Sequence, residues 1–224
     1  MTNPINGVTT PLPAGRGKGG GSSIAIFGGS FNPIHKGHVR LAQAICKAGL
    51  AEEVWLMVSP LNPLKQNDQS ELLDDNKRLH LARLATAATP CIQASDFEFH
   101  LPIPSYTVNT LAELQDAYPQ HTFSLLIGED NWQRFSRWYQ SDVIRSRHDI
   151  IVYGRKENTE STERNGIVTV HHTDGSEETH EGFQLYNISS TLIRQALRSG
   201  DLAFARRWLH PEVYRFIRQH KFYL

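Results

Sequence analysis

The stretch IAIFGGSFNPIHKGHVRLAQAI (residues 24–45) changes character twice. It opens as a short apolar run, which is typical of a buried strand, and it closes with apolar residues at helical spacing. Between the two lie a glycine pair, Pro33 and two histidines, His35 and His38, three residues apart. A strand, a glycine turn and a helix in this order predict a site at the turn. Metal ligation, phosphate binding and a purely structural turn are all open at this point.

Strand-like and helix-like segments alternate along the rest of the chain. We expect strands at 23–27, 53–59, 91–99, 122–128, 148–154, 166–172 and 183–188, and helices at 37–50, 74–88, 105–118, 130–139, 190–198 and 211–220, with a further helix between the last two. This alternation predicts an α/β fold with a Rossmann-like, doubly wound and mostly parallel sheet, and a small helical part at about 188–224. Ligands of such sheets bind beyond the carboxyl ends of the strands, so the loops after the strands should hold the site.

Composition narrows the class of protein. A chain of 224 residues suits one domain, and its formal net charge of zero argues against a sequence-independent nucleic-acid surface. Cys46 and Cys91 are the only cysteines and form no CxxC pair, which argues against a disulfide framework and favours a cytoplasmic protein. No apolar run approaches the roughly 18 residues that span a bilayer. Neither a nucleic acid nor a membrane is therefore expected as a partner.

Residues 1–23 are rich in Gly, Pro, Ser and Thr and contain almost no large apolar side chains. Such a segment cannot bury enough surface to offset its ordering entropy. We expect a disordered, dispensable leader before a single domain at 24–224. Gly15, Gly17 and Gly20 spell GxGxxG, but this fingerprint has meaning only after a strand, so we interpret it as a chance match.

The glycine–histidine loop has the chemistry of a phosphate site. Gly28 and Gly29 let the backbone turn and approach a ligand closely, and the helix that begins near Gly37 directs unpaired N–H groups at the same space. The spacing of His35 and His38 places both imidazoles on one side of the first helical turn. Zinc would need a third ligand, which no HExxH or CxxC supplies. We therefore favour hydrogen bonds from both imidazoles to phosphate over metal ligation and over a structural turn.

Two motifs carry a family resemblance. GGSFNPIHKGH (28–38) closely resembles the (H/T)xGH region of the nucleotidyltransferase superfamily, and ISSTLIR (188–194) resembles its second signature, about 150 residues further on. SPLNPLK, PSYTVNTL and LIGEDNWQRFSRWY are similar to segments of the bacterial nicotinate-nucleotide adenylyltransferases. The resemblance runs from about residue 24 to the C-terminus. It implies the nucleotidyltransferase fold and a reaction of NAD biosynthesis, in which ATP and nicotinate mononucleotide (NaMN) give nicotinate adenine dinucleotide (NaAD) and pyrophosphate.

The resemblance also implies roles for individual residues at the ATP end. His38 is expected to stabilise the α-phosphate in the transition state, with His35 beside it on the triphosphate and Arg194 adding a charge-assisted contact. The residues expected to bind ATP are Gly28, Gly29, Ser30, Phe31, Gly128, Asp130, Ser189, Ser190 and Thr191. Ser189 or Ser190 is an N-cap candidate, for which an ordinary capped surface helix is the alternative. The alternative for Asp130, which should bond ribose hydroxyls, is capping of the next helix.

A second set of residues is expected to bind NaMN. These residues are Asn32, Lys65, Tyr106, Thr107, Trp138 and Tyr139. Thr107, at a helix start, and the Tyr139 backbone should receive the ring carboxylate, and Trp138 should stack on the pyridine, with core packing as its alternative. Lys65 could meet a phosphate or simply be solvated. Asn32 stands where some relatives have Asp, which favours a turn-forming role over a charge role.

No protein metal site is expected. Mg²⁺ should arrive with ATP and be held mainly by the phosphates, because this ion keeps much of its water. The stretch HHTDGSEETHE (171–181) is read as a solvated hairpin turn around Asp174–Gly175 and not as a structural metal site. The rival functions are adenylyl transfer to nicotinamide mononucleotide or phosphopantetheine, and a non-catalytic nucleotide-binding regulator on the same fold. The oligomeric state is left open.

Overall fold

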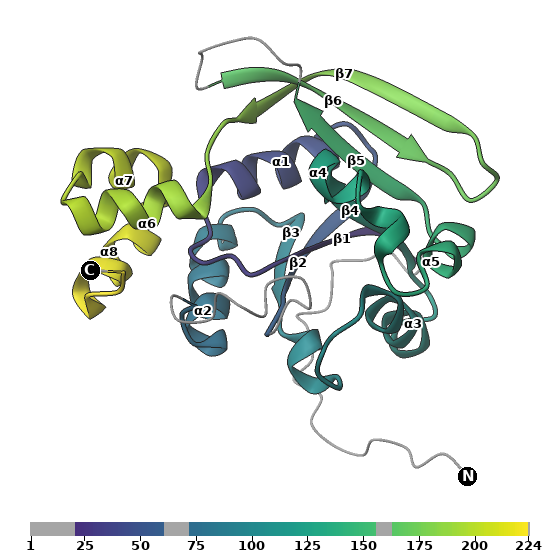
Figure 1. Cartoon of the computed structure of the whole chain (residues 1–224), viewed down its shortest axis with the longest axis horizontal. Helices are drawn as coiled ribbons and strands as arrows, with labels where there is room; N and C mark the ends of the chain where they lie inside the picture. Colours follow the sequence, from purple (N-terminus) through teal and green to yellow (C-terminus); the bar gives the residue numbers. More distant parts are fainter. Residues whose placement is uncertain (1–20, 61–71, 156–162, 224) are drawn as a thin grey trace.

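A computed structural model describes residues 21–60, 72–155 and 163–223 of the chain (Figure 1). Residues 1–20 and most of SPLNPLK, including Lys65, lie outside the described residues. The predictions for these two segments therefore stay predictions.

A mostly parallel sheet forms the centre of the described chain. Its strands are β1 (Ser23–Gly29), β2 (Glu53–Val58), β3 (Ile92–Ser95), β4 (Thr122–Gly128), β5 (Ile150–Arg155), β6 (Glu163–His171) and β7 (Glu177–Tyr186). They lie in the order β3-β2-β1-β4-β5-β6-β7, and the first five strands of this order are parallel to one another. β6 and β7 extend the sheet as an antiparallel hairpin. The predicted doubly wound α/β fold is confirmed.

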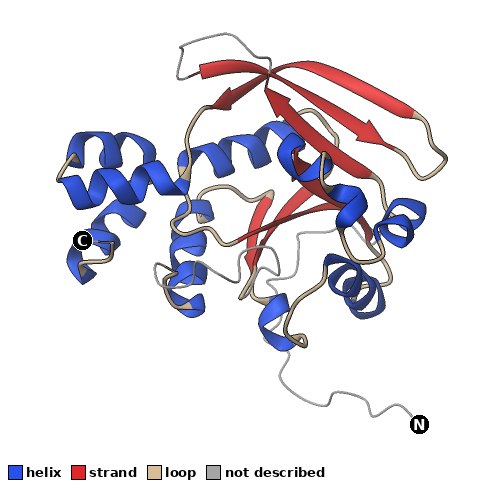
Figure 2. Cartoon of the chain, in the orientation of Figure 1, coloured by secondary structure: helices blue, strands red, loops and turns tan. Residues whose placement is uncertain are grey.

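Helices cover both faces of the sheet (Figure 2). They are α1 (Lys36–Lys47), α2 (Asp75–Thr86), α3 (Thr107–Ala117), α4 (Glu129–Trp132), α5 (Ser141–Arg147), α6 (Ser190–Ser199), α7 (Leu202–Trp208) and α8 (Pro211–His220), with 3₁₀ turns at Phe97–His100 and Phe135–Arg137. α1 and α2 pack on one face, and α6 to α8 continue the same apolar cluster beside α2. α3 and α5 pack on the other face.

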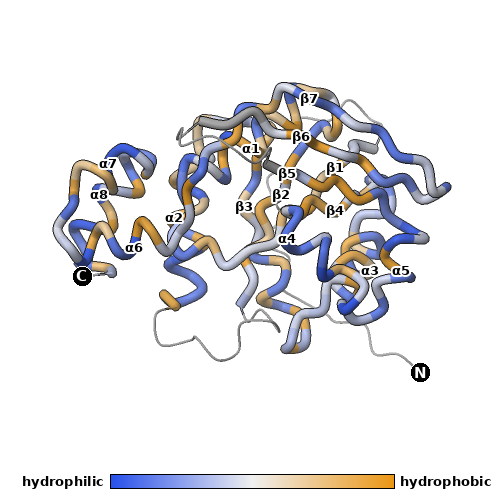
Figure 3. Tube along the Cα trace, turned by 45° about the horizontal axis from the view of Figure 1, so that its top comes forward, coloured by the Kyte–Doolittle hydropathy of each residue, from blue (hydrophilic) through white to orange (hydrophobic). Residues whose placement is uncertain are grey.

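The central strands are apolar on both sides because both sides are covered. In β1, Ala25 and Phe27 join the cluster under α1 and α2, whereas Ile24 and Ile26 join the cluster under α3 and α5. Figure 3 shows the same arrangement as apolar colour along the central strands and polar colour on the outer elements. The continuous apolar run at the start of the chain is thus a strand buried on both faces.

The strand order reverses direction at the centre of the sheet. From β1 the chain proceeds outward to β2 and β3, and then returns to the other side of β1 to form β4 and β5. Ile26 of β1 is paired with Leu125 of β4, so the loops after Gly29 and Gly128 leave the sheet side by side. This is the switch point where ligands of doubly wound sheets bind.

Three predicted elements are wrong in detail. The strand expected at 91–99 ends at Ser95, whose Oγ accepts the Phe97 N–H at 3.2 Å and starts a 3₁₀ turn. The helix expected at 130–139 is split into α4 and a 3₁₀ turn. The hairpin turn expected at 171–181 is confined to about residues 172–176, because its second half belongs to β7. Helix α5 was not predicted, since its seven residues are mostly polar and bury only Ser141 and Ile144.

Two residues of the segment expected to be a leader, Ser22 and Ser23, form hydrogen bonds with the rest of the described chain. Ser22 donates its N–H to Nδ1 of His121 at 3.0 Å, and its carbonyl accepts from the Thr122 N–H at 3.1 Å. Ser23 opens β1, and its carbonyl accepts from the Glu52 N–H at 2.9 Å. Ser23, the last residue assigned to the leader, therefore belongs to the sheet, and Ser22 is hydrogen-bonded to Thr122 of β4.

Removal of residues 1–20 is expected to leave the free energy of unfolding unchanged, because their composition predicts no packed structure. Removal of residues 1–23 should lower it by about 1–3 kcal/mol, because the hydrogen bonds of Ser22 and Ser23 are lost. Urea denaturation of the two truncated chains and the full chain measures the difference. Identical midpoints for both truncations would contradict the assigned boundary.

Candidate active site

The loop after β1 forms the floor of the site. A Cβ on Gly28 would meet nothing within 4 Å, so open space adjoins the backbone there, as the phosphate interpretation requires. Gly29 faces the ring of Phe31, which lies 3.2 Å from where its Cβ would be. Phe31 is buried and has a φ of +44°, a left-handed conformation that bulky residues rarely adopt. The surrounding contacts must therefore hold this turn in place.

The two histidines form a stacked pair at the start of α1. His35 is the N-cap and is 5% exposed, and its ring lies 3.6 Å from that of His38, centroid to centroid, at an interplanar angle of 21°. The backbone N–H of His35 donates to Nδ1 of His38 at 3.3 Å. In that arrangement Nδ1 of His38 is an acceptor, so in the neutral ring Nε2 carries the proton. His38 is thereby set up as a donor through Nε2.

Gly37, in the first turn of α1, leaves no room for a side chain. A Cβ there would lie 2.7 Å from Cγ2 of Ile188 and 2.9 Å from Nδ1 of His35. The close neighbours are thus parts of the protein itself, and one of them belongs to the second motif.

Two hydrogen bonds join the second motif directly to the first. Ser190 donates its Oγ–H to the carbonyl of Pro33 at 2.9 Å, and Nη1 of Arg194 donates to the carbonyl of Asn32 at 2.9 Å. Ser189 is the N-cap of α6, and its Oγ accepts the Leu192 N–H at 3.3 Å. The N-cap prediction for Ser189 is confirmed, and Ser190 has a separate task. Segments far apart in the sequence therefore build one site.

Arg78 on α2 is a residue of the site region that the sequence did not indicate. Its side chain is fully buried and donates to three carbonyls, those of Ser30 at 2.6 Å, Ser59 at 3.0 Å and Leu73 at 2.8 Å. Asp75 on the same helix forms an ion pair with it. An arginine in an amphipathic helix normally lies at the surface. The available sequence signal is its spacing, since Arg78 stands three, four and seven residues before the buried Leu81, Ala82 and Ala85.

The carboxyl end of β4 lies beside the loop after β1. Gly128 ends the strand as the N-cap of α4, and a Cβ there would lie 2.6 Å from Oδ1 of Asp130 and 3.2 Å from the Tyr153 ring. The exposed Asp130 thus turns its carboxylate back towards the strand end. Thr191 lies in the first turn of α6, where its Oγ1 accepts from Nη2 of Arg194 at 3.5 Å.

The start of α3 has the features of a carboxylate site. Thr107 opens the helix, and Oγ of the preceding Ser105 is buried with no hydrogen-bond partner among the described residues. Tyr106 lies beside Tyr139, with ring centroids 4.9 Å apart, and both rings are exposed. A buried hydroxyl at a helix N-terminus is available to an anionic ligand.

Beneath this helix start lies a buried acid. Oε1 of Glu98 accepts from Thr110 at 3.0 Å, and burial raises the pKa of Glu98, an effect that hydrogen bonds from Ser59 and Thr110 oppose.

Trp138 is half-buried and packs on Phe135, with ring centroids 5.4 Å apart. Its Nε1 has no hydrogen-bond partner among the described residues.

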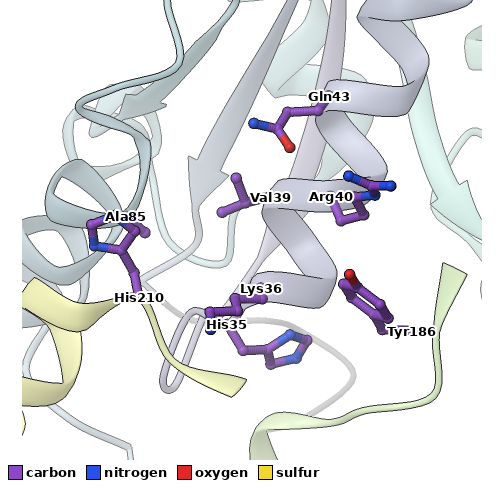
Figure 4. Close-up of a pocket in the computed structure, with 8 residues that line it drawn as sticks. All are labelled: His35, Lys36, Val39, Arg40, Gln43, Ala85, Tyr186 and His210. Atoms are coloured by element: carbon purple, nitrogen blue, oxygen red, sulfur yellow. The ribbon is translucent and has the colours of Figure 1, made fainter. Parts of the chain in front are cut away.

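A hollow of about 180 Å³ lies beside the site, on the solvent side of α1 (Figure 4). It is lined by His35, Lys36, Val39, Arg40, Gln43, Ala85, Tyr186 and His210. Both cations at its rim are already engaged, since Lys36 donates to the Arg207 carbonyl at 2.6 Å and Arg40 to Gln184 at 3.1 Å. His35 of the site loop is one of its lining residues, whereas the buried residues of α1 face the opposite way.

Two further properties concern residues 21–60, 72–155 and 163–223, the described part of the chain. No group of three or more His, Cys, Asp or Glu side chains there is arranged to hold a metal ion. Within those ranges no helix is long and apolar enough to cross a membrane.

The fold and the paired motifs define a nucleotidyltransferase. The cytidylyltransferase-like family profile matches residues 26–196. A protein of Bacteroides thetaiotaomicron, named "Probable nicotinate-nucleotide adenylyltransferase", is 45% identical over 198 residues, which cover 87% of this chain and 90% of that protein. The chain belongs to the cytidylyltransferase-like family and, within it, to the nicotinate-nucleotide adenylyltransferases.

Further similarities agree with this assignment. A protein of the same name from Flavobacterium johnsoniae is 38% identical over 201 residues, covering 89% of this chain and 98% of that protein. Among solved structures, the Plasmodium falciparum nicotinic acid mononucleotide adenylyltransferase complexed with NaAD has a TM-score of 0.66 at 19% identity, covering 90% of this chain and 97% of that chain. At this identity the structural likeness establishes the fold.

Replacement of Arg78 tests whether the site loop depends on this side chain. Arg78→Met is expected to lower the free energy of unfolding by about 2–4 kcal/mol, because three buried carbonyls lose their donor. The matched control is Arg83→Met on the same helix, where an exposed ion pair to Asp96 is removed at a cost below about 1 kcal/mol. Chemical denaturation of both variants checks the difference. Equal stabilities would show that the Arg78 contacts contribute nothing.

Proposed function

We propose that the chain transfers the adenylyl group of ATP to NaMN, giving NaAD and pyrophosphate. The observation that carries the proposal is the direct joining of the two motifs through Ser190–Pro33 and Arg194–Asn32. Together with the family relationship, this joining supports a crevice in which the loop after β1 and the start of α6 receive one triphosphate. The nicotinate end of the acceptor is then assigned to the start of α3.

The reaction requires the NaMN phosphate to be aligned with the α-phosphorus of ATP more than it requires a base to activate the nucleophile. An oxygen of the NaMN phosphate attacks the α-phosphorus of ATP, the bond from that phosphorus to the β-bridging oxygen breaks, and pyrophosphate leaves with the electron pair. The nucleophile is already an anion, so no protein base is needed. His38, fixed as a donor through Nε2, stabilises the charge that develops on the transferring group. His35 and Arg194 support the same phosphates.

Binding of ATP relies on backbone groups and short side chains. Gly28, Gly29, Ser30 and Phe31 supply the close-approach loop, Gly128 and Asp130 the ribose end, and Ser189, Ser190 and Thr191 the capped start of α6. We assign Mg²⁺ to the nucleotide itself, with the phosphates and water as its ligands, because this ion keeps most of its water. When bound, the ion neutralises phosphate charge. The cytoplasmic location expected from the cysteine pattern stays a prediction.

Recognition of the acid form of the acceptor is assigned to three groups around α3. The N–H groups at the start of the helix, the buried Ser105 hydroxyl and the Tyr139 backbone are donors suited to a carboxylate, whereas an amide would supply donors of its own. Trp138 is assigned to stacking on the pyridine and Tyr106 to the neighbouring wall, while Asn32 and Lys65 keep their proposed contacts to NaMN.

His38→Ala is expected to lower kcat by roughly 10²–10³, as the loss of a preorganised donor does at other charge-stabilising sites. Stability should change little, because His38 is only half-buried at a helix start. His100→Ala, at an exposed histidine of the 3₁₀ turn, is the control and should retain normal kcat. Pyrophosphate release and thermal unfolding are measured on both variants. A near-normal kcat or an unfolded His38 variant would contradict the assigned role.

The acceptor is tested by pyrophosphate release with Mg-ATP and either the acid or the amide mononucleotide. We expect the acid to be preferred, and Ser105→Ala to reduce kcat/KM for the acid about 5–20-fold while changing the amide little, because one carboxylate donor is lost. A strong amide preference would refute the nicotinate assignment. ATP binding without turnover of either acceptor would favour the non-catalytic regulator.

A further inference from the structure

The turn after α8, residues Lys221–Tyr223, reaches back to the site loop. Tyr223 donates its hydroxyl proton to Oδ1 of Asn32 at 2.6 Å, across 191 positions of the sequence. The same oxygen accepts the Leu73 N–H at 3.2 Å, directly before the cap of α2. Asn32 is 5% exposed and belongs to the turn between the two glycines and the two histidines.

Two donors on one oxygen fix the orientation of the Asn32 carboxamide. If the group were flipped, its NH₂ would face both the Tyr223 hydroxyl and the Leu73 N–H, and at least one buried donor would lose its acceptor. The carbonyl of the same residue is held by Arg194. Both the side chain and the backbone of Asn32 are therefore placed by residues remote in the sequence.

The turn after α8 is itself built into a defined position. Lys221 and Tyr223 have φ values of +55° and +61°, left-handed conformations that ordinary residues adopt only when their surroundings hold them. Phe222 donates its N–H to the Ile217 carbonyl at 3.1 Å, and Lys77 of α2 lies over its ring at 5.3 Å. The chain reverses after α8 and directs Tyr223 at the loop instead of at solvent.

Tyr223 remains a donor under ordinary conditions. Burial raises the pKa of its hydroxyl above the usual value for tyrosine, and Arg194 and Arg78 oppose this effect. The same two arginines hold the loop carbonyls of Asn32 and Ser30. Tyr223, Arg78 and Arg194 are thus among the side chains that hold the loop after β1 in place.

We propose that Tyr223 is a positioning residue for adenylyl transfer, which acts by holding the Asn32 carboxamide and with it the loop 28–35 in the substrate-binding conformation. The kinetic consequences of this inference rest on the proposed function, whereas the contact between Tyr223 and Asn32 is independent of it. Tyr223 touches no reacting group. Its effect should therefore pass entirely through Asn32.

The first experiment compares Tyr223→Phe, which removes only the hydroxyl, with Tyr214→Phe on α8 as the matched control. Tyr223→Phe should lower kcat/KM about 5–10-fold, the size of one buried hydrogen bond, and should speed amide exchange in residues 28–35 by a similar factor. Tyr214→Phe should change neither, because Tyr214 packs on the apolar cluster from within α8 and not from the turn that follows it. If the amides of residues 28–35 exchange in Tyr223→Phe at the same rate as in the wild-type protein, the proposal is overturned.

The second experiment is a double-mutant cycle that separates positioning from general stability. In an Asn32→Ala background, Tyr223→Phe should cost nothing further in kcat/KM, because the acceptor is gone. In an Asn32→Asp background, where an acceptor oxygen remains, it should again cost about 5–10-fold. An equal cost in all three backgrounds would overturn the role through Asn32.

Failure of the two proposals can be told apart. If wild-type protein does not turn over NaMN, the proposed function fails, and the exchange rates of residues 28–35 in Tyr223→Phe and Tyr214→Phe still test the positioning role. If wild-type protein turns over NaMN but Tyr223→Phe matches it in kcat/KM and in loop exchange, the function stands and the positioning role fails.

Discussion

Three carbonyl groups of the loop after β1 accept hydrogen bonds from side chains that are remote in the sequence. Arg78 holds the carbonyl of Ser30, Arg194 that of Asn32 and Ser190 that of Pro33. A loop that receives phosphate must keep its carbonyl oxygens away from the anion, because their partial charge would repel it. With these oxygens tied to protein donors, we assign the phosphates to the N–H groups of the first turn of α1. The rest of the site depends on this arrangement.

The three donors arrive from different parts of the fold, which explains why the whole domain is needed to form a small site. Arg78 comes from α2, and Arg194 and Ser190 come from α6, after the hairpin β6–β7. The left-handed Phe31 shows that the loop would not take this shape unaided. Loop geometry is thus imposed by tertiary structure, and the cost of burying Arg78 is offset by the carbonyls it satisfies.

The sequence predicted what local patterns determine. The apolar run of β1, the helical spacing of α1 and the Pro at the start of α8 identified their elements, and the alternation along the chain gave the sheet class. The strand predicted at 91–99 was wrong beyond Ser95. Phe97 and Phe99 alternate as in a strand, but the Ser95 hydroxyl starts a turn instead. The sequence also missed α5, because seven mostly polar residues show no clear period.

Within the proposed site, the residues assigned to the ligand carry a sequence signal that the residues supporting the loop lack. Gly28, His35 and His38 have types and spacings tied to phosphate chemistry. Arg78 and Tyr223 have no such signal, since their partners lie 48 and 191 positions away and only the fold brings them together. The supporting contacts are non-local, and a local pattern cannot contain them.

A crystal structure with a non-hydrolysable ATP analogue tests most directly whether the loop after β1 receives the triphosphate. It should place the triphosphate within hydrogen-bond distance of His38 Nε2 and of N–H groups at the starts of α1 and α6, with the Arg78–Ser30 contact unchanged. A triphosphate bound in the hollow on the solvent side of α1, or a loop whose carbonyls had turned towards the phosphates, would contradict the account.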